Sequence, residues 1–418
     1  MSNKILGILL LAGLLSVSVL LLNCGSSSSR PSGVLYVASQ GENTVGSYAI
    51  DLDNGNLSKI NTTAPTDISP TSAVLSPSGN VIYVLNPGSS KISAFTANAN
   101  GTASAAGTTS VDCGLPANDP CPLPNPVAMA RDSAGAFLFV VSQGSFPSPS
   151  NCPRDPVAGV PNDECPAISV FATTSGSSSL TLVGGKPVRL SKIPTSIASI
   201  ADSKGNTFLY VTNTTNLAGT TDNTLSQFLV SSTGTLTPEE NNGPYLTAST
   251  PTAVLAVHTT PVGANGGIFL YITNAMTNNV NTYQLCTAIS TVCTQQSDID
   301  HFFLNQVGPP VALAGTNPVA LAVDPTNNFL YIVDHDSADV RGFRISPTTG
   351  GLSELSSAVM ATGLGPVALA IHPTGKFLFV SNNGASSVSG FNMDPTTGTL
   401  SQPIIVTSSA NPYGMVAK

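Results

Sequence analysis

The chain has 418 residues and a formal net charge of −8, from 14 Lys and Arg against 22 Asp and Glu. This acidic balance excludes a nucleic-acid-binding protein, which needs a basic surface. With 41% hydrophobic and 9% charged residues, the chain is not a disordered polyelectrolyte, and its 37 Gly and 32 Pro favour many short strands joined by turns.

The N-terminus has the pattern of an export signal. Lys4 precedes an apolar stretch at residues 5–22, and residues 21–24 (Leu-Leu-Asn-Cys) resemble a bacterial lipobox, although Asn23 stands where a smaller residue is usual. We expect residues 1–24 to be a signal peptide, Cys24 to carry a lipid anchor, and residues 25–32 to form a flexible tether. The alternative is an uncleaved apolar anchor, because the stretch is just long enough to span a bilayer.

The cysteine spacing agrees with export. Seven Cys are present, and without Cys24 six remain in three local couples: Cys113 with Cys121, Cys152 with Cys165, and Cys286 with Cys293. An even set at short spacings in an exported chain predicts disulfides. Zinc is the alternative, but no CxxC pair and no nearby His accompany the couples.

An internal repeat is the main signal in the remaining sequence. Seven short strands begin with an aliphatic residue followed by Tyr or Phe, at residues 35–37, 82–84, 138–140, 209–211, 270–272, 330–332 and 378–380. Runs of small apolar residues precede six of them, at 71–75, 126–130, 195–199, 252–256, 318–322 and 366–370. Such a repeat of strands and turns indicates blades stacked around an axis.

The chain ends supply the seventh run. Residues 411–417 match the pattern of residues 317–322, and no such run precedes the first aromatic strand. We therefore predict an all-β fold, a seven-bladed β-propeller over residues 33–418, whose C-terminal strand closes the first blade and removes the open sheet edge.

The repeat resembles a known family. Residues 210–213 spell Tyr-Val-Thr-Asn, the signature of the YVTN-repeat propellers, and residues 365–382 resemble the repeat of the seven-bladed lactonase family, which includes 6-phosphogluconolactonase. The resemblance covers about residues 31–418 and implies the fold. It also implies a lactonase site built from His, Glu and Arg around the propeller axis.

The predicted blades place loops on two faces. We call the connection face the one that carries the second-to-third-strand loops and the connections to the next inner strand, because the long insertions fall mostly there. The position three after each aromatic residue lies at this face, and it is occupied by Ser39, Asn86, Ser142, Asn213, Asn274, Asp334 and Asn382. These side chains form either a polar ring for a ligand or bonds to their own backbone.

The densest polar cluster is Asp334-His335-Asp336, at the same face. Asp334 and His335 are candidate catalytic residues, and Asp336, Asn213, Asn274 and Asn382 are candidate ligand-binding residues. Arg189 and Lys192, before the fourth inner strand, are candidate ligands for a carboxylate or phosphate. A solvated loop and structural roles are the competing interpretations.

Two functions follow from these patterns. The first is a non-catalytic, lipid-anchored module, expected to be a monomer, that binds a protein or glycan at the cell envelope. The second is a lactonase-like hydrolase of a small lactone or ester. With only six Arg in the chain and no Glu at the strand ends, the sequence favours the first. It predicts no cofactor and no metal, and it has no nucleophile elbow, P-loop or HExxH motif.

Overall fold

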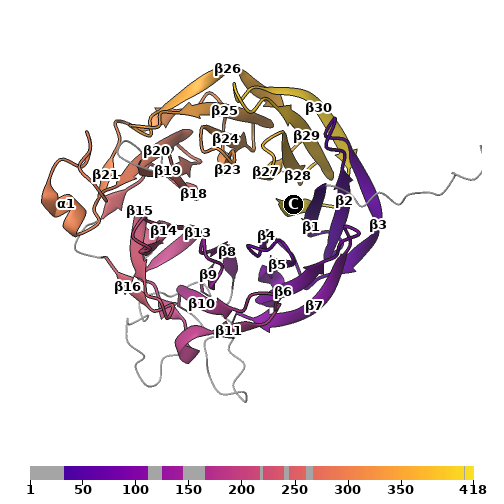
Figure 1. The fold of residues 1–418 in the computed structure, drawn as a ribbon, viewed down its shortest axis with the longest axis horizontal. Helices are drawn as coiled ribbons and strands as arrows, with labels where there is room; N and C mark the ends of the chain where they lie inside the picture. The colour runs from indigo at the N-terminus through magenta and orange to yellow at the C-terminus, as the bar shows by residue number, and fades with distance from the viewer. Residues whose placement is uncertain are drawn as a thin grey trace, which may run out of the picture. The chain divides into compact units, whose positions relative to one another are not determined.

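The computed structural model describes residues 33–111, 125–144, 165–216, 220–239, 244–259, 267–408 and 410–418. Across these ranges no helix is long and apolar enough to cross a membrane. The unit from Pro31 to Lys418 contains seven antiparallel sheets arranged in a ring, with one short strand of each sheet nearest the centre (Figure 1). The predicted seven-bladed β-propeller is confirmed.

Each blade runs from an inner strand outward through a second, third and outer strand. Blade 1 has β31 (Pro412–Ala417), β1 (Gly33–Ser39), β2 (Thr44–Ile50) and β3 (Leu57–Pro65); blade 2 has β4 (Ser72–Leu75), β5 (Val81–Asn86), β6 (Lys91–Ala97) and β7 (Ala103–Ser110); blade 3 has β8 (Pro126–Arg131), β9 (Phe137–Ser142), β10 (Ala167–Thr173) and β11 (Leu180–Leu182), with β12 (Val188–Arg189) also on β10.

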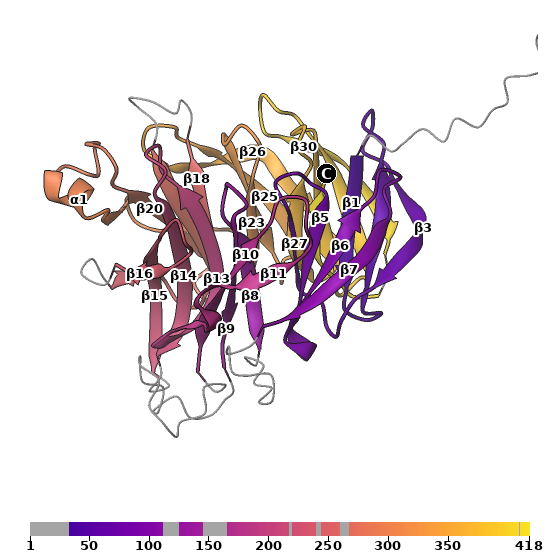
Figure 2. The same ribbon diagram turned by 60° about the horizontal axis from the view of Figure 1, so that its bottom comes forward.

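The second half of the ring follows the same order. Blade 4 has β13 (Lys192–Ala201), β14 (Thr207–Asn216), β15 (Thr221–Val230) and β16 (Leu236–Pro238), with β17 (Tyr245–Leu246) on β15; blade 5 has β18 (Pro251–His258), β19 (Ile268–Asn274), β20 (Asn279–Leu285) and β21 (Leu304–Gln306), with β22 (Val311–Ala312) on β20; blade 6 has β23 (Pro318–Val323), β24 (Phe329–Asp334), β25 (Asp339–Ile345) and β26 (Leu352–Ala361); blade 7 has β27 (Pro366–Ile371), β28 (Phe377–Asn382), β29 (Ser387–Met393) and β30 (Leu400–Thr407). The described residues also contain three short helices: η1 (Pro87–Ser89), η4 (Val183–Gly185) and α1 (Gln296–Asp300), which lies at the outer edge of blade 5 (Figure 2).

The two chain ends meet in one sheet, as predicted. β31 pairs antiparallel with β1, so that Leu35 opposes Ala417 and Tyr36 opposes Val416. The N–H of Val34 donates to the carbonyl of Lys418, and the N–H of Lys418 donates back. The last residues therefore complete the first blade.

The aromatic residue of each second strand packs between blades. Tyr331 and Val333 of blade 6 lie in one buried cluster with Leu378, Val380 and Phe391 of blade 7. The Tyr331 hydroxyl donates to the carbonyl of Gly398 in blade 7 at 2.7 Å, which gives this buried phenol a partner. Tyr331 thus links neighbouring blades both by packing and by a hydrogen bond.

A left-handed residue precedes the inner-strand proline in six blades. Its φ lies between 52° and 61°, and the residues are Ser69, Asn125, Thr250, Asn317, Gly365 and Asn411. Five of the six are not glycine, so this backbone conformation does not itself require glycine here. Gly365 is the one glycine among the six.

The cysteine predictions are met where the structure describes them. Cys286 and Cys293 form a disulfide with a Cα–Cα distance of 5.5 Å, and Cys165 is disulfide-bonded. Cys24, Cys113, Cys121 and Cys152 lie outside the described residues. The Cys286–Cys293 bond closes the loop between β20 and β21 on the face opposite the connection face, which we call the turn face.

Candidate functional site

The polar residues three after each aromatic are buried between blades. All seven side chains are at most 1% exposed, because strand alternation turns them sideways toward the preceding blade. Asn213 donates through Nδ2 to Oγ of Ser226 at 3.0 Å, Asn274 to Oδ1 of Asn281 at 2.9 Å, and Asn382 to Oγ of Ser389 at 2.9 Å. Each asparagine therefore ties the second strand of its blade to the third.

Blade 6 replaces this neutral pair with charges. Asp334 stands at the asparagine position and Arg341 at the serine position, with Oδ2 of Asp334 3.0 Å from Nε of Arg341. The same guanidinium reaches Oδ2 of Asp339 at 3.0 Å and Oε1 of Glu354 at 3.2 Å. Three carboxylates thus share one cation.

Asp334 keeps a proton more easily than an ordinary carboxyl group. Burial, the charge of Asp339 and a hydrogen bond between these two carboxyl groups raise the pKa of Asp334 to about 7, against the opposing effect of Arg341. Asp334 is fully buried, and a Cβ on Gly315 would lie 2.0 Å from its Oδ2. The connection from blade 5 to blade 6 therefore covers it, and no substrate can reach it directly.

His335 and Asp336 lie beyond the strand end and are accessible. Nδ1 of His335 lies 2.7 Å from Oδ1 of Asp336, and their side chains are 40% and 58% exposed. Asn317 donates to the same oxygen at 3.1 Å. The hydrogen bonds from His335 and Asn317 lower the pKa of Asp336, so that it is a carboxylate at neutral pH. A carboxylate on Nδ1 favours the tautomer whose Nε2 is a free base.

Nε2 of His335 lies beside a turn of blade 7. A Cβ built on Gly365 would lie 3.6 Å from that nitrogen, 3.0 Å from the backbone N of Gly384 and 3.3 Å from its Cα, so the turn is closely packed. The N–H of Gly384 has no hydrogen-bond acceptor among the described residues. Gly365 therefore lets an accessible imidazole and an unpaired backbone donor approach the same turn, and acyl transfer uses a base and a donor of these kinds.

The predicted cations are not part of this arrangement. Nζ of Lys192 lies 3.2 Å from Oδ2 of Asp222 and donates to Oγ1 of Thr224 at 2.8 Å, so it is engaged within blade 4. Arg189 lies in β12, on the third blade. His335 belongs to blade 6, and two blades separate it from Arg189 along the shorter way round the ring.

The residue four after each aromatic lies on the opposite side of the strand from the residue three after it, toward the next blade. These residues are Gln40, Pro87, Gln143, Thr214, Ala275, His335 and Asn383. Gln143 donates to the carbonyl of Pro194 at 2.9 Å and Asn383 to that of Pro412 at 3.4 Å, in each case at the start of the next inner strand. His335 borders Gly365 at the same place in blade 7. The side chains that reach the next inner strand thus stand four residues after the aromatic, one residue later than the predicted polar ring.

Within the described residues, no three His, Cys, Asp or Glu side chains come together as ligands for a metal ion. The chemistry that this arrangement can perform is activation of a water by His335, with the Gly384 N–H donating to an oxygen that gains negative charge.

Comparison with protein families finds a match over part of the chain. Residues 28–116 match the family model described as lactonase, 7-bladed beta-propeller. No curated protein matches the sequence.

Solved structures share the fold at low sequence identity. The periplasmic gluconolactonase of Pseudomonas aeruginosa is 15% identical, with a TM-score of 0.65 over 92% of this chain and 98% of that one. A protein of Bacteroides fragilis described as a candidate 6-phosphogluconolactonase is 16% identical, with a TM-score of 0.65 over 94% and 99%. A protein from Lactobacillus plantarum is 14% identical, with a TM-score of 0.66 over 92% and 99%. The chain thus has the fold of the lactonase-type seven-bladed propellers, as its resemblance implied.

Proposed function

We propose that this protein is a lactonase-like hydrolase whose general base is His335. The observation that carries the proposal is the approach of Nε2 of His335 and the backbone N of Gly384 to one turn, where a Cβ on Gly365 would lie 3.6 Å and 3.0 Å from them. The lactonase family model and the two lactonase-type neighbours support this function over a purely binding role. The accessible pair His335 and Asp336 takes the catalytic place that the sequence analysis gave to Asp334 and His335.

The reaction adds water across the ring C–O bond of the lactone. Nε2 of His335 accepts a proton from the attacking water while the oxygen bonds to the carbonyl carbon, and the N–H of Gly384 donates to the carbonyl oxygen as it becomes negative. The imidazolium, stabilised by Asp336, then returns the proton to the ring oxygen as the C–O bond breaks. The product is the open hydroxy acid.

The connection face favours an uncharged substrate with an apolar substituent. Leu364, beside Gly365, is 70% exposed, and Met276, in the turn between β19 and β20 of blade 5, is 75% exposed. Lys91 lies 3.5 Å from Asp67, and Lys192 and Arg341 are paired with carboxylates as well. These cations are therefore neutralised, and a phosphorylated lactone gains little from them.

We also propose that the protein acts outside the cytoplasm, held at a membrane by a lipid on Cys24. The apolar stretch at residues 5–22, the lipobox-like residues 21–24 and the Cys286–Cys293 disulfide support this location. Its substrate would then be a lactone present at the cell envelope.

A lactone panel tests the function. The purified chain is assayed by acid release on an alkyl δ-lactone, glucono-δ-lactone and 6-phosphogluconolactone. We expect turnover, fastest on the alkyl lactone, and a loss of about 100-fold or more in kcat for His335→Gln. Tight binding of a lactone without turnover would instead support a binding module.

Gly365→Asn provides the sharpest variant. Asparagine occupies the same left-handed position at residues 125, 317 and 411, so its φ is compatible, while its side chain lies between His335 and Gly384. The new Cβ comes within 3.0 Å of the backbone N of Gly384, so the turn must shift slightly, and we expect activity to be lost with a modest fall in melting temperature. Thr250→Asn, at the same position of blade 5, is the control and should keep full activity. Equal activity of the Gly365→Asn variant and the unmodified chain would refute the site.

A further inference from the structure

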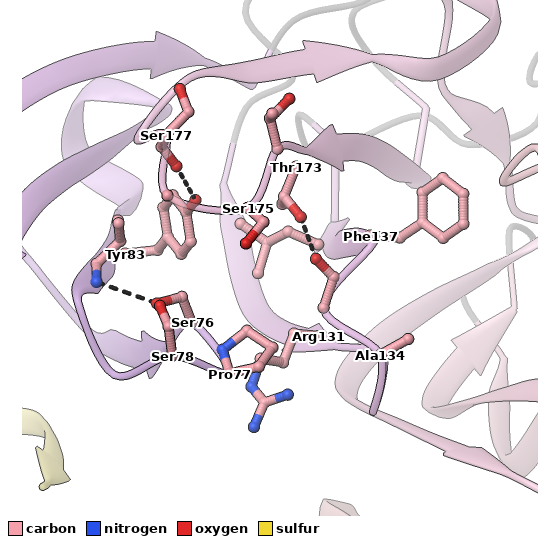
Figure 3. Close-up of a pocket in the computed structure, with 15 residues that line it drawn as sticks. Ser76, Pro77, Ser78, Tyr83, Arg131, Ala134, Phe137, Thr173, Ser175 and Ser177 are labelled. Carbon is pink, nitrogen blue, oxygen red and sulfur yellow. Dashed lines mark hydrogen bonds between the residues drawn. The ribbon is translucent and has the colours of Figure 1, made fainter.

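A second concave site lies on the turn face, between blades 2 and 3. It is a cavity of about 80 Å³ lined by three turns: residues 76–78 of blade 2, residues 134–135 of blade 3 and residues 173–177 of blade 3 (Figure 3). Pro77, Val81, Phe137 and Leu138 contribute apolar surface, and Arg131 supplies the cation. The site lies at the opposite end of the blades from His335.

The guanidinium of Arg131 has donors to spare. Nη1 donates to the carbonyl of its neighbour Asp132 at 3.1 Å, and no carboxylate of the described residues forms an ion pair with it. The Asp132 carboxylate accepts instead from the N–H of Phe137 at 2.8 Å. By contrast, Arg341 has three carboxylate partners. Arg131 therefore keeps at least three N–H donors without an anion.

This arginine is partly removed from water, and that removal is unfavourable without a counter-charge. Burial lowers the pKa of Arg131, and the charge of Asp132 only partly opposes the effect. A planar guanidinium with free donors matches a carboxylate in two parallel hydrogen bonds. An anion in the cavity would thus repay the cost of desolvating the side chain.

Three other polar side chains of the cavity have protein partners already. The Tyr83 hydroxyl donates to the carbonyl of Ser177 at 3.4 Å, the Thr173 hydroxyl donates to the carbonyl of Gly135, and Oγ of Ser76 accepts from the N–H of Val81 at 3.0 Å. Figure 3 shows Arg131 beside Pro77 and Tyr83, whereas the ring of Phe137 points away from them. The site therefore offers one strong anion donor beside apolar walls.

We propose that this cavity binds a small monocarboxylate, with its carboxylate on Arg131 and a short alkyl group against Pro77 and Leu138. The small volume limits the ligand to a few non-hydrogen atoms, which fits propionate or butyrate better than a sugar acid. The apolar walls favour an organic carboxylate over inorganic phosphate, whose whole surface is hydrated.

Calorimetric titration of the purified chain with propionate, at constant ionic strength, tests the site. We expect saturable binding of propionate and butyrate with at least tenfold weaker binding of phosphate. Arg131→Gln should weaken propionate binding at least tenfold. Arg344→Gln, which removes a guanidinium 4.7 Å from the ring centroid of Phe329 and outside the cavity, is the control and should bind normally.

Arg131→Lys controls for loss of folding in the glutamine variant. Lysine keeps the positive charge but cannot form two parallel hydrogen bonds with one carboxylate. It should stay folded and bind propionate more weakly than the unmodified chain. No saturable binding, equal binding of phosphate, or unchanged propionate affinity in Arg131→Gln would overturn the proposal. None of these results depends on the hydrolase activity at His335.

Discussion

Oδ2 of Asp334 lies 3.0 Å from Nε of Arg341, where blade 7 has the neutral pair Asn382 and Ser389 at 2.9 Å. The two pairs occupy the same repeat positions and join the same two strands. Blade 6 has therefore exchanged an amide–hydroxyl hydrogen bond for a buried ion pair, and the same guanidinium also binds Asp339 and Glu354.

Asp334→Asn should change how stability depends on pH. The folded pKa of about 7 lies above the ordinary carboxyl value of 3.8, so between about pH 4 and pH 7 the unfolded chain releases a proton that the folded chain retains. Folding stability contributed by this group falls as the pH rises through that window and is constant above it. Relative to the asparagine variant, the unmodified protein should thus lose stability from pH 4 to pH 7. Chemical unfolding at several pH values measures the difference, and a pH-independent difference would contradict the assignment.

Gly315→Ala should destabilise the same network. The new Cβ would lie 2.0 Å from Oδ2 of Asp334 and 2.7 Å from Nε of Arg341, so the ion pair or the covering connection must move. Overpacking of this kind costs about 1–3 kcal/mol in free energy of unfolding. Gly351→Ala is the matched control, because its Cβ would meet only Oγ1 of Thr349 at 3.3 Å. Equal unfolding midpoints for the two variants in urea would argue against the close contact.

Asp336→Asn should lower kcat on a lactone substrate by about tenfold to 100-fold. An amide at this position can donate a hydrogen to Nδ1 of His335, which moves the imidazole proton to Nε2 and removes the free base. KM should change little, since Asp336 contacts the histidine and not the substrate. A variant of an exposed histidine on the blade 5 insertion, His301→Ala, should leave kcat unchanged. Full activity in Asp336→Asn would remove the carboxylate from the mechanism.

Cys24→Ala should abolish lipid attachment. If the lipobox-like residues 21–24 direct modification, the intact mass of the membrane-extracted protein exceeds that of the processed chain by the lipid, and the alanine variant lacks this increment. The variant should also lose its association with the membrane fraction or remain as the longer, unprocessed chain. Identical masses for the two proteins would favour the uncleaved apolar anchor.

The fold could be predicted because each blade repeats the same demands. Seven aromatic positions such as Tyr331 pack between blades, and small residues form the inner strands, so the count of blades follows from the count of repeats. The closure by β31 was also readable, because residues 411–417 resemble an inner strand that the first blade lacked. Repetition converts a weak local signal into a strong global one.

The site was harder to predict because it depends on side-chain direction and on partners distant in sequence. Asn213, Asn274 and Asn382 stand at or near the connection-face ends of their strands, but strand alternation turns their side chains between the blades. The engagement of Lys192 by Asp222 depends on β13 and β15 flanking the same strand. His335, Gly365 and Gly384 come together where three turns from two blades meet, and no spacing in the sequence encodes this proximity.

The pairing of Leu35 with Ala417 also sets an order of events during synthesis. The first three strands of blade 1 emerge early, yet their sheet lacks its innermost member until nearly all of the chain has left the ribosome. The ring can therefore close only after residues 412–417 have been synthesised, through a contact between the two most distant parts of the propeller, and such long-range closure is slow compared with local hairpin formation. The export that we propose would benefit from this delay, because the ring cannot close before its last strand is present.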